Sequence, residues 1–84
     1  MMEEIEMAAA PAAMNGDACY QLALSYASGR SRPVDLVSAH TWFNIAVLHG
    51  CRDAVARRAE LASEMTPAEL TAALKAARAL MTRH

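Results

Sequence analysis

Large side chains are scarce in this 84-residue chain, which has one Trp, one Phe and two Tyr. Glycine and proline occur three times each, whereas alanine occurs twenty times. Alanine has the highest helix propensity, and no segment shows the alternating pattern of a strand. The composition therefore excludes a β-rich fold and predicts helices around a thin core. A single copy should be marginally stable, or stabilised by a partner.

The chain also lacks an excess of charge of one sign, since 8 basic and 9 acidic residues give a net charge of −1. Binding to nucleic acid or to an anionic membrane needs a basic patch, so neither partner is expected. The N-terminal run MMEEIEM is acidic where a signal peptide is basic, and no apolar run is long enough to cross a membrane. Cys19 and Cys51 are far apart and form no CxxC pair, which indicates buried, reduced thiols in a cytoplasmic protein.

Helix-ending residues divide the rest of the chain. Gly29 and Gly50 suit the left-handed conformation in which many helices end. Helices are therefore expected over about 17–28, between Asp35 and Gly50, over about 52–64 and over about 67–81. Residues 1–15 are acidic, then alanine-rich, then broken by a proline. We interpret them as a tail or short helix before a helical domain at 16–84.

Helix-starting residues support the same division. Asp17 either caps the first helix or places a negative charge near its N-terminus, and Asp35 caps the second. The sharpest local pattern is Thr66-Pro67-Ala-Glu69, a capping box with proline at its favoured first position. It predicts the start of the fourth helix at Pro67.

Apolar residues recur at helical spacing in each expected helix. The four stripes are, in chain order, Ala18, Leu22 and Tyr26, widened by Ala23 and Ala27; Ala39, Trp42, Phe43 and Ala46; Ala54, Leu61 and Met65, joined by Val55, Ala59 and Ala62; and Leu70, Leu74, Ala77 and Met81, with Ala73 and Leu80 beside them. At this spacing Trp42 and Phe43 are expected in the core rather than in a ligand site. Because the connections are short, the chain is expected to be all-α, with two antiparallel helix hairpins stacked side by side.

The segment from Asp17 to Gly50 resembles a Sel1-like repeat, a relative of the tetratricopeptide repeat. The matching residues occur in the order of the family pattern: Ala18, Leu22, Tyr26, Gly29, Asp35, Ala39, Trp42, Phe43, Ala46 and Gly50. Residues 51–84, with the run LASEMTPAEL, resemble the degenerate last repeat that closes many bacterial Sel1-like proteins. The resemblance implies an α/α solenoid with one repeat at 16–50 and a capping repeat at 51–84. It also implies a non-catalytic adaptor or scaffold role in protein–protein interaction.

Three positions depart from the family pattern. Ala23 replaces a glycine in the first helix, which should widen the helix spacing slightly. Ser31 and Arg32 replace a loop glycine and a valine. The loop therefore loses one flexible residue and one apolar anchor.

The sequence gives little support for a metal-binding or catalytic site. The residues that could bind a metal are Cys19, His40, His49 and Cys51. Only His49 and Cys51 are close in sequence, and no second pair has zinc spacing, so no metal site is expected. Ser38 and His40 are two residues apart on a helix and point in different directions, so they form no nucleophilic dyad. His40 is interpreted as a solvated side chain, and no catalytic residue or cofactor is expected.

A partner surface is expected on the first helix. Tyr20 and Leu24 lie off its apolar stripe and should be partly exposed. Solenoids usually need about three repeats and polar caps at both ends, and nothing covers this flank unless residues 3–14 fold over it. We expect the flank to meet a second copy of the chain or another protein. The resemblance places the partner in the groove between the first and third helices, which holds Tyr20, Leu24, Arg57, Glu60 and Glu64.

Three functional hypotheses follow. The leading one is a non-enzymatic interaction module, and the second is an inhibitor or regulator of one enzyme or receptor, which the sequence does not separate from the first. A helix-turn-helix DNA binder is suggested only by size and helicity and is disfavoured by the net charge. Arg30 and Arg32 are interpreted as a solvated loop rather than as a grip for an acidic partner.

Overall fold

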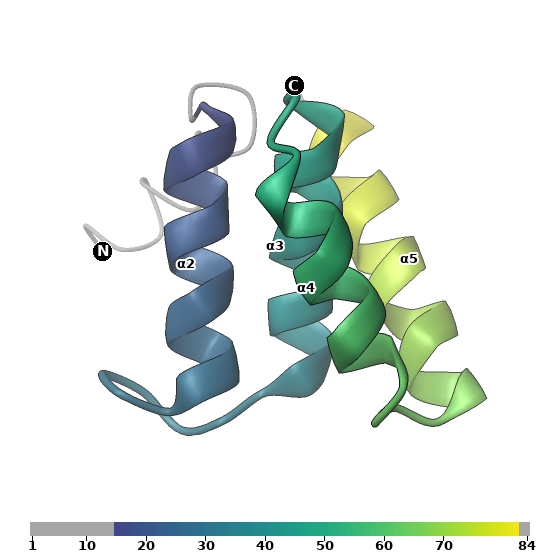
Figure 1. Cartoon of the computed structure of the whole chain (residues 1–84). Helices are drawn as coiled ribbons and strands as arrows, with labels where there is room; N and C mark the ends of the chain where they lie inside the picture. The colour runs from purple at the N-terminus through teal and green to yellow at the C-terminus, as the bar shows by residue number, and fades with distance from the viewer. Residues whose placement is uncertain (1–14, 83–84) are drawn as a thin grey trace, which may run out of the picture.

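A computed structural model describes residues 15–82, in which four helices follow one another (Figure 1). They are α2 (Gly16–Ser28), α3 (Leu36–Leu48), α4 (Asp53–Ala62) and α5 (Pro67–Thr82), and this part of the chain contains no strand. None of these helices is long and apolar enough to cross a membrane. The expected lead-in at 1–15 lies outside the described residues except for Asn15.

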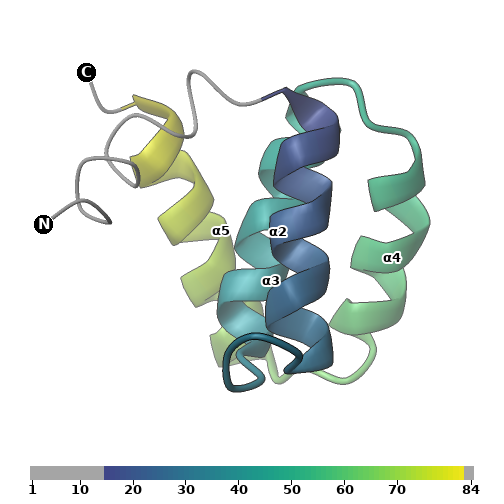
Figure 2. The same ribbon diagram turned by 90° about the vertical axis from the view of Figure 1, so that its left-hand side faces the viewer.

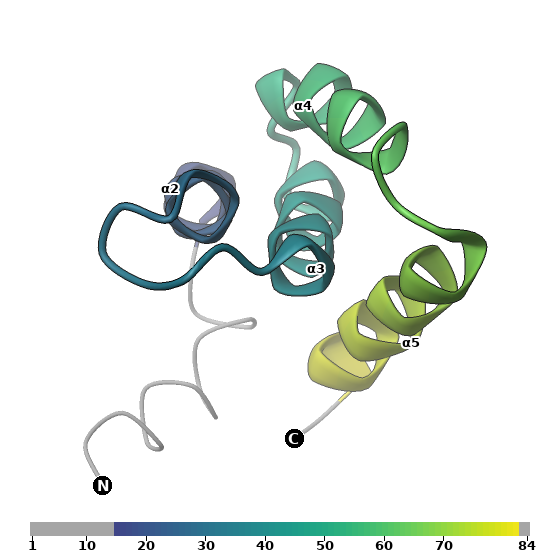
Figure 3. The same ribbon diagram turned by 90° about the horizontal axis from the view of Figure 1, so that it is seen from below.

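The helices alternate in direction, so that consecutive helices are antiparallel (Figure 1). The closely packed pairs are α2 with α3, α3 with α5 and α3 with α4. Figure 2 shows α3 behind α2, and Figure 3, viewed from below, shows α2, α4 and α5 around α3. The fold is therefore all-α and consistent with stacked helix hairpins, as expected, and α3 is its central element.

Side-chain caps fix where the helices begin. Asn15 caps α2, because its Oδ1 accepts a hydrogen bond of 2.7 Å from the backbone N–H three residues later. Asp17 therefore supplies charge in the first turn instead of the cap. Asp35 caps α3 in the same way, at 3.0 Å. The capping box of α5 is present in both directions: Thr66 N donates to Glu69 Oε1 at 2.8 Å, and Glu69 N donates to Thr66 Oγ1 at 3.1 Å.

Two glycines end helices with positive φ, as expected. Gly29 has φ 73° and Gly50 has φ 88°. A Cβ atom on Gly29 would lie only 2.8 Å from Cγ2 of Val34, whereas one on Gly50 would meet nothing within 4 Å. Both conformations are strained for residues with a side chain. At Gly29 a side chain would in addition collide with Val34 of the following loop.

The core forms where small residues let the outer helices approach α3. The expected core residues of α3 are all buried, namely Ala39, Trp42, Phe43 and Ala46. Ala73 and Ala77 of α5 are buried against the cluster, and Thr41 Oγ1 of α3 lies 3.3 Å from the backbone oxygen of Ala73. This contact brings a side chain of α3 directly to the backbone of α5.

The expected faces of the outer helices are partly confirmed. Ala54, Leu61 and Met65 are buried as expected, and so are Ala23 and Ala77. In α2, however, Gly16 and Cys19 are also buried, whereas Ala18, Leu22 and Tyr26 are half-buried. Close packing through the smaller residues turns the buried face of α2 by one position. For the same reason α5 buries Ala73 and Ala77 and leaves Leu74 49% exposed, and Val55 of α4 is 47% exposed. Ala59 is exposed as well.

Candidate protein-interaction groove

Four of the five residues expected to bind a partner line one hollow between α2 and α4. Leu24 comes from α2, Arg57 and Glu60 come from α4, and Glu64 lies in the turn that follows α4. The hollow has a volume of about 120 Å³, and the buried ring of Phe43 from α3 also lines it. Figure 3 shows how α2 and α4 both flank α3. The packing of α2 and α4 on α3 thus brings together residues that are distant in sequence.

The fifth residue, Tyr20, joins the two walls of this hollow. Its ring packs on Phe43, with centroids 5.8 Å apart and planes tilted by 57°. Its hydroxyl interacts with Arg57, and this interaction raises the pKa of the guanidinium, followed by the negative charges of Glu60 and Asp53. Tyr20 is therefore half-buried and contacts both α3 and α4.

Helical spacing explains why these side chains share a face. In α2 the residues stand at i, i+4 and i+7, and in α4 at i, i+3 and i+4. They are Tyr20, Leu24 and Ala27 in α2, and Arg57, Glu60 and Leu61 in α4, with Glu64 in the turn that follows. Each set covers one side of its helix, and the two sides are turned toward each other.

A second hollow of about 590 Å³ continues the first toward the loop after α2. The two share Leu24, Ala27 and Arg57, and together they form what we call the interaction groove. The second hollow adds residues that sequence reasoning missed: Gln21, Ser25, Ser28, Arg30 and Ser31. Gln21, Ser25 and Ser28 stand at i, i+4 and i+7 along α2, next to Leu24. This helical spacing could have revealed them. Arg30 is exposed, as expected, yet it lines the groove.

The interaction groove has an apolar centre and charges of both signs. Leu24 and Phe43 form the apolar part, Arg30 and Arg57 supply positive charge, and Glu60 and Glu64 supply negative charge on and just after α4. Two of its three serine hydroxyls have backbone partners, since Ser25 Oγ donates to Leu22 O at 2.7 Å and Ser28 Oγ accepts from Arg30 N at 3.3 Å. No histidine or cysteine is among the lining residues. The groove therefore offers apolar and charged groups for contacts with a binding partner.

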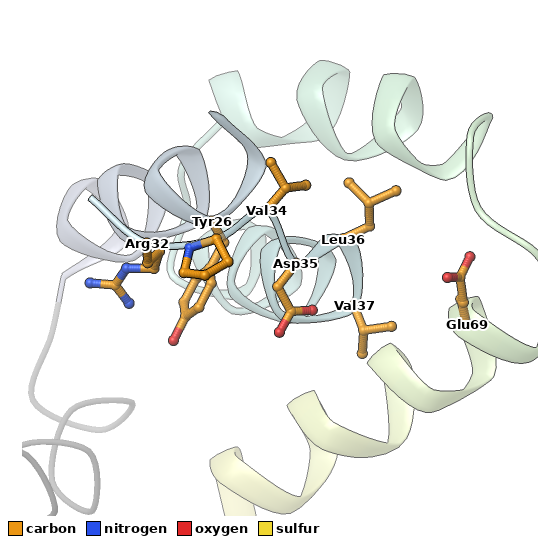
Figure 4. A pocket seen from close by; sticks show the side chains of 8 residues that line it. Tyr26, Arg32, Val34, Asp35, Leu36, Val37 and Glu69 are labelled. Carbon is orange, nitrogen blue, oxygen red and sulfur yellow. The ribbon is translucent and has the colours of Figure 1, made fainter. Parts of the chain in front are cut away.

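Another hollow, of about 510 Å³, lies at the end of the bundle where α3 and α5 begin (Figure 4). The guanidinium carbon of Arg32 lies 4.5 Å from the centre of the Tyr26 ring, so Arg32 stacks on the ring where the family pattern has an apolar anchor. Asp35 and Glu69 also line this hollow, but both cap helices. These two carboxylates thus have structural roles, whereas Arg32, which was expected in a solvated loop, is half-buried and its Nε has no hydrogen-bond partner among the described residues.

Neither the histidines nor the cysteines form a metal site within residues 15–82, where no three potential ligands cluster. Ser38 Oγ donates to Asp35 Oδ2 at 2.8 Å and so belongs to the cap of α3. Cys19 is buried and Cys51 is half-buried, and both thiols are free. Burial, followed by the proximity of Cys51, raises the pKa of Cys19 and keeps its thiol protonated.

His40 corrects the sequence-based interpretation most clearly. It was expected to be solvated, but it is only 5% exposed. Its Nδ1 lies 3.4 Å from Nδ2 of Asn44, which is itself buried. Burial, and then the charge of Arg58, lowers the pKa of His40, so the ring is neutral at pH 7.

Comparison with known proteins gives no relative. No family model matches the chain, and no curated protein or solved structure shows a significant match. The likeness to Sel1-like repeats therefore rests on the residues of the sequence itself.

Proposed function

We propose that this chain is a Sel1-like, non-catalytic protein–protein interaction module that acts as an adaptor or scaffold in the cytoplasm. It holds another protein, or a second copy of itself, in the interaction groove between α2 and α4. One observation supports this most. The five residues chosen from the sequence meet in one place: four line the same hollow, and Tyr20 interacts with Arg57.

The chemistry of the groove indicates what it binds. Apolar side chains at its centre suit an aliphatic or aromatic side chain of the partner, and the charged rim sets the partner's orientation. A matching segment would place an acidic residue near Arg30 and Arg57 and a basic residue near Glu60 and Glu64. Such an arrangement favours one partner over others through charge complementarity.

The variant Arg57→Glu tests this proposal. Arg57 is exposed, so charge reversal leaves the core intact while it breaks the link to Tyr20 and repels an acidic partner group. The matched control is Arg52→Glu, the same change at an exposed residue that precedes α4 and lines neither hollow. We expect Arg57→Glu to reduce the amount of co-purifying protein, or of self-association in sedimentation, by roughly tenfold.

The control should retain the wild-type level of association. Circular dichroism of both variants would show whether the helical content is preserved. A stable wild-type monomer that recovers no partner contradicts the proposal. Equal loss of association in both variants also contradicts it, because the effect would then be one of net charge.

A further inference from the structure

A separate concave site lies on the other side of α4. It is bounded by α4 and α5, has residues of α3 in its lining and has a volume of about 320 Å³. We call it the α4/α5 hollow. Its apolar lining includes Leu48, Leu74 and Met81. Leu48 is 67% exposed and Leu74 49% exposed, so two large aliphatic side chains meet water in one concavity.

Single exposed leucines are ordinary on protein surfaces, but two in the same hollow mark a place where burial by a partner is favourable. Leu74, Ala77, Arg78 and Met81 stand at i, i+3, i+4 and i+7 and so form one side of α5. Ala77 packs in the core and Met81 lies partly against it, whereas Leu74 and Arg78 are exposed. The exposed part of this side can receive an external side chain.

The charge of the α4/α5 hollow has one sign. Arg58 and Arg78 line it, and none of its lining residues is acidic. The chain as a whole has a net charge of −1, so this positive charge is local. A ligand that combines an aliphatic group with carboxylates would match both properties of the site.

Arg58 is held in place from within the protein. Its Nη1 donates to Asn44 Oδ1 at 2.6 Å, and Asn44 Nδ2 lies 3.4 Å from Nδ1 of His40. Asn44 and His40 are both buried, so the chain of contacts reaches from the core to the wall of the hollow. An arginine that is already oriented loses less conformational entropy when it pairs with a carboxylate.

We propose that the α4/α5 hollow binds a short acidic segment of another protein. A leucine, isoleucine or methionine side chain of that segment enters between Leu48 and Leu74, and neighbouring carboxylates pair with Arg58 and Arg78. This proposal does not rest on the interaction groove, because the α4/α5 hollow lies on a different side of α4 and shares no residue with the groove.

The test uses the full chain and a fluorescent five-residue peptide with one leucine flanked on each side by two glutamates. Binding is measured by fluorescence anisotropy and by the methyl NMR signals of Leu48, Leu74 and Met81. Two control peptides replace the glutamates by glutamine or the leucine by alanine. We expect saturable binding of the first peptide, with shifts of these three methyl groups, and at least tenfold weaker binding of both controls.

A matched pair of protein variants locates the site. Arg78→Glu and Lys75→Glu make the same charge change at exposed positions of α5, but only Arg78 lines the hollow. We expect Arg78→Glu to weaken peptide binding at least tenfold and Lys75→Glu to change it less than about twofold.

Four results would overturn the proposal. They are absence of binding at millimolar peptide, equal weakening by both protein variants, equal binding of the glutamine peptide, and saturable binding without shifts of the three methyl groups. A dimer that Arg78→Glu dissociates would assign the hollow to a second copy instead. Shifts of the Leu48 and Leu74 methyl signals on replacing Glu3, Glu4 and Glu6 by glutamine, without peptide, would assign it to the chain's own N-terminal segment.

Discussion

Asn44 shows how one buried amide can serve two partners of different charge. Its oxygen accepts from Arg58 at 2.6 Å, and its nitrogen faces Nδ1 of His40 at 3.4 Å. A neutral imidazole with a free Nδ1 can accept that hydrogen bond, whereas a charged imidazolium would offer a donor and would repel Arg58. The protonation state of His40 is therefore tied to the geometry of α3 and α4.

The variant His40→Gln should make stability less dependent on pH. The pKa of His40 is lowered from 6.5 in the folded state, so below about pH 6.5 the unfolded chain binds a proton that the folded chain does not. The stabilising contribution is complete above pH 6.5 and is lost as the pH falls toward the folded-state pKa. Urea unfolding between about pH 7.5 and 5.5 should show a steeper loss of unfolding free energy in the wild type than in the variant.

All other titratable groups are the same in both proteins, so the difference between the two curves reports on His40. Glutamine keeps a side chain that can accept from Asn44 and does not gain a proton in this range. Parallel curves across the whole interval would show that burial of His40 does not affect its protonation.

Helix ends were predictable from the sequence because caps are local. Asp35, Thr66 and Glu69 act on backbone groups within three residues, and Gly29 and Gly50 act through their own φ angles. Each expected end therefore lies within about two residues of the observed one. The exception is the cap of α2, where Asn15 takes the role considered for Asp17.

Helix faces were less predictable because they depend on which neighbour packs closest. Leu74 fits an apolar stripe in sequence, but Ala73 and Ala77 let α5 approach α3 and turn Leu74 outward. His40 looks solvated in sequence, but Asn44 and Arg58 give it a buried place. The interaction groove could be proposed because its residues are polar or off the stripe. The α4/α5 hollow could not, since Leu74, one of its two leucines, was assigned to the core.

The variant Thr66→Ala should cost about 1 kcal/mol of unfolding free energy, because it removes the side-chain acceptor for the N–H of Glu69 at the start of α5. The matched control is Thr71→Ala, an exposed position inside the same helix. There the change should be neutral or slightly stabilising, since alanine favours helix interiors. Chemical denaturation of both variants measures the difference, and equal stabilities would show that the capping box does not anchor α5.

The whole molecule is arranged around α3. It contributes the buried Phe43 and Ile45, and each of the other described helices packs against it. When one outer helix unfolds, α3 still packs against the other two described helices. When α3 unfolds, the core shared by all of them is exposed. Stability should therefore be highest in the centre and lower outside.

Amide hydrogen exchange should reveal this difference directly. We expect the slowest exchange in the middle of α3 and faster exchange in α4, which has ten residues and no side-chain hydrogen bond at its N-cap residue Arg52. NMR-detected exchange under native conditions measures both. Equal protection of α4 and α3 would mean that the molecule opens only as a single unit.

The position of α4 has a consequence for regulation. Arg57 and Arg58 are consecutive in α4, but Arg57 lines the interaction groove and Arg58 lines the α4/α5 hollow. The short helix α4 therefore separates the two sites. A ligand that moves α4 toward one site widens the other. Occupancy of the two sites would then be thermodynamically linked, with the same coupling free energy in both directions.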